Sequence, residues 1–486
     1  MNNIIKFFSL LLVAAVVLAA VYSCASEQQG AEQTDVAADD TAAPEPETTD
    51  KYGDNLPETM DLGGYEYRFL GYEEYNINSD YTLYLMPDEM DGDILNDTAY
   101  KRNSEIEERL NVKLTFVPCQ DHYAGELIVK TVMAGEDAYD SAILWTSLES
   151  GIKLLKNNCL YNILNLPYIN PESEYYFPTM TGMYNINNKL YCIGSYFTNS
   201  GIMPIQIIFN SSYITDMGME LPYDIVFSDS WTIDVLNEYI KDAYFDLNGN
   251  GVKDYGDKVG YYNHEALTNY MISGLDINTV TKTEDGRYAP LISGEKLVNA
   301  IQKLMEFKNG ETVREIKSYE KTHVFMDGNA MFTTTGTGAL DLRAIEAFDF
   351  GIAPYPKYDE NQERYCCYAV LSPVWVPSTI QNPEAVGAVT EALAAASYKQ
   401  MNPVYIDIYI EQKILRDENS VKCLKLMQEN VVSDFLRVMD FTGGLMKDYD
   451  YVNKICKKGP DQIVSSLAAI ETKVTVLAEE FFRYFD

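Results

Sequence analysis

Apolar and polar positions in the first part of the folded body alternate between strand-like and helix-like patterns. Residues 67–72 (YRFLGY) and 112–117 (VKLTFV) are predicted to be strands, and residues 140–145 (DSAILW) form a nearly continuous apolar run. Between the first two runs, apolar residues recur at helical spacing in a helix that Asp97 is predicted to cap and that ends near Leu110. Apolar strands that alternate with helices predict a parallel sheet covered by helices.

The chain begins with a separate apolar run, residues 7–21, of about 15 residues. A membrane-spanning helix needs roughly 20 residues, so the run and its weakly basic start are typical of a signal peptide. It ends in residues 21–24 (VYSC), which resemble a bacterial lipobox with Val in place of the commoner Leu. We predict a lipoprotein signal peptide over residues 1–23, with Cys24 as the lipid anchor that holds the chain extracytoplasmically on the cell membrane. A plain secretory signal and a short transmembrane anchor are the alternatives.

The segment after Cys24 is acidic and contains almost no large apolar side chains. Residues 24–58 are rich in Glu, Asp, Thr, Ala and Pro and cannot bury enough surface to offset the entropy of ordering. We predict a disordered acidic tether there, spanning roughly 30–35 Å as a coil. The remaining body, residues 59–486, exceeds the size at which one core usually splits, so it is expected to form two or more lobes.

Composition narrows the classes of partner. Acidic residues outnumber basic ones by 73 to 37, for a net charge of −36, which opposes binding to nucleic acid and to anionic lipid head groups. Apart from Cys24, seven cysteines remain, without CxxC pairs or metal-ligand spacing, and we predict that they are buried free thiols. The chain has 38 Tyr and only 3 Trp; a ring face with a hydroxyl suits sugar and peptide recognition.

A series of short motifs follows along the body. In chain order they are residues 134–140 (AGEDAYD), 188–194 (NKLYCIG), 208–210 (IFN), 217–223 (MGMELPY), 230–236 (SWTIDVL), 325–332 (FMDGNAMF), 350–356 (FGIAPYP) and 416–420 (RDENS). In this order the motifs resemble bacterial extracellular solute-binding proteins of family 1, the maltose-binding-like type. One departure is residues 333–338 (TTTGTG), where maltose-binding-like members often carry a Trp.

The resemblance implies an α/β fold: a two-lobed periplasmic-binding-protein-like clamp of type II, each lobe a mixed sheet covered by helices. The chain would cross between lobes near residues 195–203 and 368–375. Lobe 1 would comprise about 59–196 and 373–412, and lobe 2 about 203–370 and 413–486. Solute in the cleft would close the lobes by hinge motion, and an ABC-transporter permease would recognise the closed, monomeric protein.

Candidate solute contacts lie at strand ends, because ligands of parallel sheets bind outside the carboxyl ends of the strands. Aromatic rings stack on sugar C–H faces, and carboxylates accept hydrogen bonds from sugar hydroxyls. The candidates are Tyr72, Glu73, Glu74 and Trp145 in lobe 1, Tyr196 at the first crossover, Gly336 and Thr337 in lobe 2, and Trp375 after the second crossover. For each of them, packing in the core or on the surface is the alternative; Trp231, at a helix start, is assigned to packing.

Residues 246–257 (DLNGNGVKDYGD) match a calcium-binding loop. Such a loop places oxygen ligands at positions 1, 3, 5, 7, 9 and 12 and Gly at position 6. The candidate metal ligands are Asp246, Asn248, Asn250, the Val252 carbonyl, Asp254 and Asp257. With Asp in place of the usual last Glu, we expect weak affinity and a structural role for Ca²⁺, and no organic cofactor. A turn that binds no metal is the alternative.

Signals of catalysis are few. The chain has 3 His, which show no zinc spacing, and it contains neither a GxSxG sequence nor a Walker A sequence. A glycosidase needs only two carboxylates at the right separation, so a secreted carbohydrate-active enzyme stays an alternative. A surface glycan-binding or adhesion lipoprotein without transport coupling is the other. We predict a non-enzymatic lipid-anchored protein that captures a carbohydrate, expected to be an oligosaccharide, for an ABC importer; a peptide or another polar solute remains open.

Overall fold

A computed structural model describes most of the chain after the tether. The described residues are 52–72, 84–120, 123–144, 151–198, 204–254, 256–284, 286–292, 294–316, 323–335, 342, 345–369, 371–410, 415–446 and 449–486. They belong to one compact unit, Asp50–Asp486. Of the helices described, none combines the length and the apolar character that a membrane crossing requires. Cys24 lies outside the described residues.

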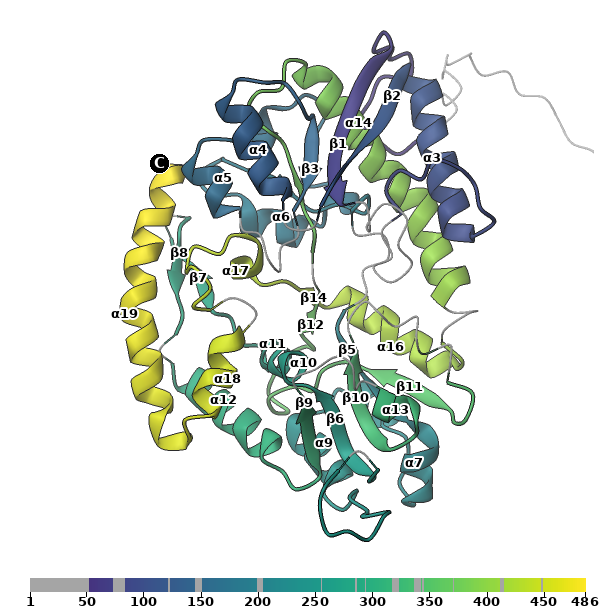
Figure 1. Cartoon of the computed structure of the whole chain (residues 1–486), viewed down its shortest axis with the longest axis vertical. Helices are drawn as coiled ribbons and strands as arrows, with labels where there is room; N and C mark the ends of the chain where they lie inside the picture. Colours follow the sequence, from purple (N-terminus) through teal and green to yellow (C-terminus); the bar gives the residue numbers. More distant parts are fainter. Residues whose placement is uncertain are drawn as a thin grey trace, which may run out of the picture. The chain divides into compact units, whose positions relative to one another are not determined.

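The first of two five-stranded sheets has the order β2-β1-β3-β13-β4 (Figure 1). Its strands are β1 (Tyr65–Tyr72), β2 (Val112–Cys119), β3 (Ser141–Ile143), β4 (Cys192–Ile193) and β13 (Val374–Trp375). Strand β1 is parallel to β2 and β3, whereas β13 is antiparallel to β3 and β4. The predicted parallel sheet is therefore confirmed for β1–β3, and a strand from late in the sequence makes the sheet mixed.

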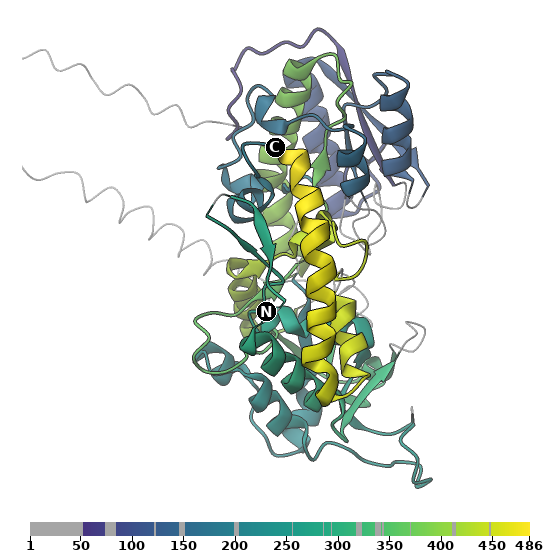
Figure 2. The ribbon, with the colours of Figure 1, turned by 90° about the vertical axis from the view of Figure 1, so that its left-hand side faces the viewer.

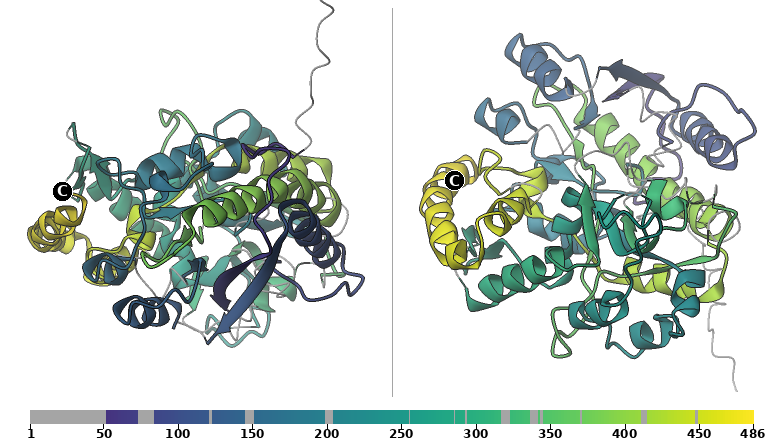
Figure 3. Two further views of the ribbon diagram at one scale, coloured as in Figure 1. Left: turned by 90° about the horizontal axis from the view of Figure 1, so that it is seen from above. Right: turned by 60° about the horizontal axis from the view of Figure 1, so that its bottom comes forward.

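Helices pack on the first sheet. They are α3 (Ile94–Leu110), α4 (Ala124–Met133), α5 (Ile152–Lys156), α6 (Pro178–Tyr184) and α14 (Pro383–Ala396). Helix α14 lies across the sheet and contacts β1 (Figure 3, left).

The predicted N-cap of α3 was wrong. The Asp93 side chain, not Asp97, accepts hydrogen bonds from the backbone N–H groups of Leu95 and Asn96, so the helix begins at Ile94. Both aspartates precede apolar residues at helical spacing, and the sequence pattern alone does not distinguish them. Asp97 instead lies in the first turn, where a negative charge interacts favourably with the helix dipole.

The second sheet has the order β11-β5-β10-β6-β9. Its strands are β5 (Gln206–Asn210), β6 (Val259–His264), β9 (Val313–Ile316), β10 (Ala330–Thr335) and β11 (Phe350–Ala353). Strand β5 pairs antiparallel with both β10 and β11, while β6 is parallel to β10 and β9. The two sheets confirm the predicted α/β class with mixed sheets.

Helices around the second sheet are short, apart from α12 and α16. They are α7 (Ser211–Asp216), α8 (Tyr223–Phe227), α9 (Ile233–Ile240), α10 (Glu265–Asn269), α11 (Met271–Gly274), α12 (Glu295–Lys308), α13 (His323–Met326) and α16 (Glu418–Glu429). Trp231, just before α9, is fully buried, and its indole N–H donates to the Pro354 carbonyl at 3.0 Å. Its assignment to packing is confirmed.

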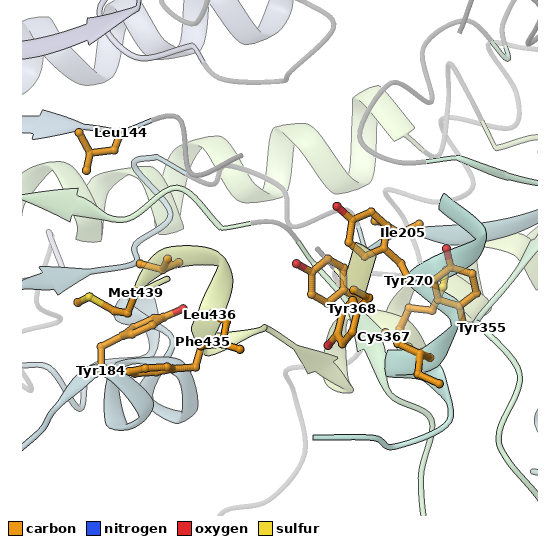
Figure 4. Packing of buried hydrophobic residues seen from close by; sticks show 14 of the residues in the cluster. Leu144, Tyr184, Ile205, Tyr270, Tyr355, Cys367, Tyr368, Phe435, Leu436 and Met439 are labelled. Atoms are coloured by element: carbon orange, nitrogen blue, oxygen red, sulfur yellow. The ribbon is translucent and has the colours of Figure 1, made fainter. Parts of the chain in front are cut away.

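Three stretches of chain lie side by side between the sheets. Strands β12 (Cys367–Tyr368) and β14 (Val431–Val432) pair in parallel, and the Ile205 N–H donates to the Tyr368 carbonyl at 2.7 Å. The Tyr270 ring stacks on Tyr368 with centroids 4.9 Å apart (Figure 4). These backbone and ring contacts hold the crossing segments together.

The C-terminal part of the chain contacts segments that flank both five-stranded sheets. After β14 come α17 (Phe435–Val438), α18 (Asp450–Cys456) and α19 (Ile463–Phe482), and α19 packs on α12 and on the hairpin of β7 (Val280–Lys282) and β8 (Tyr288–Pro290) (Figure 2). Beyond α19, the Phe485 ring lies 5.5 Å from Tyr191, which directly precedes β4. The lobe boundaries stay a prediction, but residues assigned to lobe 2 contact lobe 1 here.

The last residues of the predicted tether belong to the folded body. Asp54 forms an ion pair of 2.5 Å with Arg109, and the Asn55 amide donates to the Glu391 carboxylate at 2.7 Å. Leu56 is buried. The prediction of disorder is therefore wrong for residues 52–58, because specific partners far along the chain offset a local composition that is unfavourable for folding.

Glu391 of α14 is a carboxylate that is fully buried among hydroxyl and amide groups. The Tyr175 and Tyr176 hydroxyls donate to it at 2.5 and 2.7 Å, in addition to Asn55. Burial raises the pKa of Glu391 above its ordinary 4.5, although these hydrogen bonds oppose the shift.

We expect the free energy of unfolding to depend on pH through Glu391. Because its folded pKa is raised, its contribution to stability is complete below pH 4.5 and is lost as pH rises through the folded pKa. Glu391→Gln should therefore flatten the pH dependence above pH 4.5 in urea denaturation. Exposed Glu108→Gln is the matched control; equal slopes in wild type and Glu391→Gln would contradict the prediction.

Candidate functional site

Most of the predicted solute contacts directly follow strands that the structure shows. Strand β1 ends at Tyr72, β3 at Ile143 and β10 at Thr335. Five of the predicted contacts lie outside the described residues: Glu73, Glu74, Trp145, Gly336 and Thr337. Their role stays a prediction. Tyr72 itself is fully buried at the end of β1, opposite Cys119 of β2, so the structure gives its side chain a core position.

Tyr196 lies at the predicted first crossover within a group of rings. Its centroid is 4.7 Å from Phe177 and 4.9 Å from Tyr398, and its backbone N–H donates to the Tyr175 carbonyl. The side chain is half-buried, and this burial raises the pKa of Tyr196 to about 12. Tyr196 thus keeps some exposed surface in a position fixed by its neighbours.

Trp375 lies in the core of the first sheet rather than at a surface. It occupies β13 between β3 and β4, and its side chain is 0% exposed. Gly151 approaches the ring so closely that a Cβ at this position would lie 2.1 Å from the Trp375 Cη2 atom. The expected solute contact is corrected to a packing role, because the strand after the crossover enters the sheet instead of passing along its edge.

We expect Trp375→Ala to lower the free energy of unfolding by about 3–5 kcal/mol, since it removes a large side chain from a closed core. Chemical denaturation would measure the loss, with Tyr123→Ala, at a 51% exposed site, as the control. A loss of solute affinity without a loss of stability would restore Trp375 as a contact residue.

The sequence-based interpretation missed a third segment between the sheets. Residues 430–432 lie beside β12, where the Cys367 and Ala369 N–H groups donate to the Asn430 and Val432 carbonyls. The segment then enters α17, whose Val438 carbonyl accepts from the Gly151 N–H. Two adjacent valines after a helix-ending Asn were the available signal, but a strand of two residues is too short for period analysis.

The predicted calcium loop turns at two of its glycines, which adopt the left-handed backbone conformation that glycine favours. Gly249 and Gly251 adopt left-handed φ values of 69° and 71°, and both of their N–H groups donate to the Asp246 carboxylate. The Asn248 and Asn250 amides donate to Asp254. Hydrogen bonds, first from the Gly256 backbone and then from these amides, lower the pKa of Asp254. The loop's own donors therefore already engage these two carboxylates.

The donor set fits Ca²⁺ in kind but requires rearrangement. Asp257 is buried and accepts from the Leu247 and Asp254 N–H groups and the Tyr244 hydroxyl. Within the described part of the chain, no three or more His, Cys, Asp or Glu side chains form a group that could hold a metal ion. The two Asn amides would have to present oxygen instead of nitrogen to a cation, as Ca²⁺ requires.

Calcium binding stays a prediction with a direct test. We expect Ca²⁺ to raise the Tm of the wild-type protein and EDTA to reverse the rise, because a ligand of the folded state stabilises it by mass action. Asp246→Ala should abolish the response, whereas Asp216→Ala, at an exposed helix end outside the loop, should keep it. An unchanged wild-type Tm with Ca²⁺ would show that the loop is only a turn.

The cysteines of the described residues form no disulfides with one another. The seven described cysteines are free, five of them buried and two half-buried. Burial raises the pKa of Cys366 to about 12, which keeps the thiol protonated and unreactive at neutral pH. The predicted free thiols are confirmed, and the five buried ones act as small apolar core residues.

Comparison with known proteins identifies the fold. No family model matches the chain, and no curated protein matches its sequence. Among solved structures, a cyclo/maltodextrin-binding protein complexed with maltotetraose has a TM-score of 0.57 at 14% identity, covering 84% of this chain and 97% of its own. The cyclic α-maltosyl-1,6-maltose-binding protein of Arthrobacter globiformis has a TM-score of 0.58 at 14% identity, covering 86% and 100%.

A third structure agrees with these two. The extracellular solute-binding protein of Staphylococcus aureus in complex with maltose has a TM-score of 0.58 at 10% identity, covering 84% of this chain and 97% of its own. The chain therefore has the two-lobed type II fold of maltose-binding-like solute-binding proteins, and the resemblance inferred from short motifs is confirmed at the level of the fold.

Proposed function

We propose that this chain is a lipid-anchored solute-binding protein that captures a carbohydrate, expected to be an oligosaccharide, and delivers it to an ABC importer. The observation that carries the proposal is the likeness over more than four-fifths of the chain to solved proteins that hold maltotetraose and maltose. Fold alone does not set function, so the specific contacts carry the test.

The proposed solute site lies where β1, β3 and β10 end. Glu73 and Glu74 would accept hydrogen bonds from sugar hydroxyls, and Trp145 would stack on a sugar C–H face. Gly336 and Thr337 would supply the contact from the second sheet. A solute that touches both lobes favours the closed arrangement by the difference between its affinities for the two arrangements.

The three adjacent crossing segments support hinge closure. A hinge concentrates its change of backbone angles in a few residues between two packed bodies. Each sheet here has its own helices, and the contacts of Ile205, Tyr368 and Val432 keep the crossings in register. Closure would then present a defined surface to the permease.

The proposed anchor at Cys24 supports delivery. A tether raises the effective concentration of the protein near its transporter without any new contact. Residues 52–58 belong to the folded body, so the acidic residues between Cys24 and this segment would form the leash. The acidic charge keeps the leash from adhering to anionic head groups.

The decisive experiment screens the mature protein against maltodextrins and short peptides by thermal shift, followed by calorimetry. We expect maltodextrins to raise the Tm and Trp145→Ala to weaken their binding by roughly 10–100-fold, since stacking and buried hydrogen bonds are lost together. Tyr123→Ala, at an exposed site, is the matched control. Stabilisation by peptides alone would overturn the carbohydrate assignment, and release of cleaved sugar would overturn the binding role.

A further inference from the structure

The described part of the chain contains a cavity whose lining differs from the predicted solute contacts that the structure describes. Its volume is about 440 Å³, and it lies among α6, the β7–β8 hairpin and the start of α17. This volume falls in the usual range of small-molecule sites. Of the predicted solute contacts that the structure describes, none lines the cavity.

Buried polar groups form part of its lining. Thr279 and Asp434 are only 3% and 4% exposed, and the Thr279 hydroxyl lies 3.5 Å from the Asp434 Oδ1 atom. Asp434 also caps α17 by accepting from the Leu436 N–H at 3.0 Å. A carboxylate held by its own helix and a neighbouring hydroxyl is preorganised to accept further hydrogen bonds.

Aromatic rings form the apolar side of the same cavity. The rings of Tyr288 and Phe435, which both line the cavity, stack with centroids 4.7 Å apart. Behind the lining, Tyr184 stacks on Phe435 with centroids 5.9 Å apart (Figure 4). Because Tyr288 and Phe435 are almost fully buried, they offer a rigid apolar boundary.

The charges of the lining select the class of ligand. Among the described lining residues, Asp434 is the carboxylate and Lys282, which is exposed, is the cation, so their charges cancel. An anion would be attracted by Lys282 and repelled by Asp434, whereas a cation would be attracted by Asp434 and repelled by Lys282. An uncharged molecule with several hydroxyls can donate to Asp434 and accept from Lys282 at the same time.

We propose that this cavity is a second ligand site for an uncharged, hydroxyl-rich molecule of monosaccharide size. The inference does not depend on the proposed capture of an oligosaccharide. Because the walls come from separate elements, an occupant would contact both α6, next to the first sheet, and the hairpin that packs on α19. These walls are already joined, since the Tyr288 hydroxyl donates to the Met183 carbonyl at 2.8 Å.

Gly182 is a position at which a larger side chain can be added to the lining of the cavity. It lines the cavity, and a Cβ built on it has no heavy atom within 4 Å, so a larger side chain would enter open space. Leu also forms helix more readily than Gly, so Gly182→Leu should keep α6 intact. Gly294→Leu, at another glycine with open space around it that does not line the cavity, is the matched control.

Calorimetry on the mature chain with D-glucose, D-galactose and D-mannose at millimolar concentration tests the site. We expect at least one of them to bind wild type and Gly294→Leu equally, and Gly182→Leu to bind it at least tenfold more weakly. Asp434→Asn should also weaken binding by about tenfold, because Asn caps a helix as well as Asp but removes the carboxylate. This second variant decides the test if Gly182→Leu fails to fold.

Three outcomes would overturn the site. They are the absence of binding to wild type, unchanged affinity in both cavity variants, and binding of L-serine but of no sugar. Maltotetraose is titrated in parallel: its binding should persist in Gly182→Leu. If wild type binds a monosaccharide but does not bind maltotetraose, the result counts against the proposed capture function and not against this cavity.

Discussion

The architecture depends on β13, a strand of only two residues that brings the chain back into the first sheet. Strand β13 enters the first sheet between β3 and β4, pairing Val374 with Ile143 on one side and with Ile193 on the other. Without it, β4 would have no partner in this sheet. The strand follows the whole second sheet in sequence, so the first sheet is complete only after the second has been made. Trp375 stabilises this insertion by filling the space that Gly151 leaves open.

Tyrosine enrichment has a structural explanation in addition to a functional one. Many of the ring hydroxyls lie in the cores and are hydrogen-bonded there, as for Tyr67 with Ser141 and Tyr261 with Thr334. Among the described residues, the tyrosines that are at most 2% exposed are Tyr67, Tyr72, Tyr176, Tyr184, Tyr261, Tyr262, Tyr355, Tyr368, Tyr405 and Tyr451. A buried hydroxyl is tolerated when it finds a partner, so a high tyrosine content does not by itself indicate a sugar-binding surface.

The region between the sheets combines two kinds of site. Adjacent segments held by backbone hydrogen bonds would provide the hinge on which the proposed solute capture depends. The cavity beside α6 is bounded instead by side chains from the hairpin and from the start of α17. Both features depend on the third crossing, because Val432 pairs with β12 and Asp434, two residues later, lines the cavity. A change in the relative position of the lobes would therefore alter both.

The sequence by itself determined the local elements and the fold class. Apolar periodicity placed β1, β2 and α3 within a few residues, and ordered motifs led to the two-lobed type II fold. It did not determine which strand end or core each aromatic residue occupies. Tyr72 and Trp375 had the residue types of sugar contacts, yet both are buried, and residues 52–58 are ordered through Arg109 and Glu391. Only the tertiary structure decided these points, because burial and pairing depend on partners from tens to hundreds of residues away, whereas periodicity reports only on neighbours along the chain.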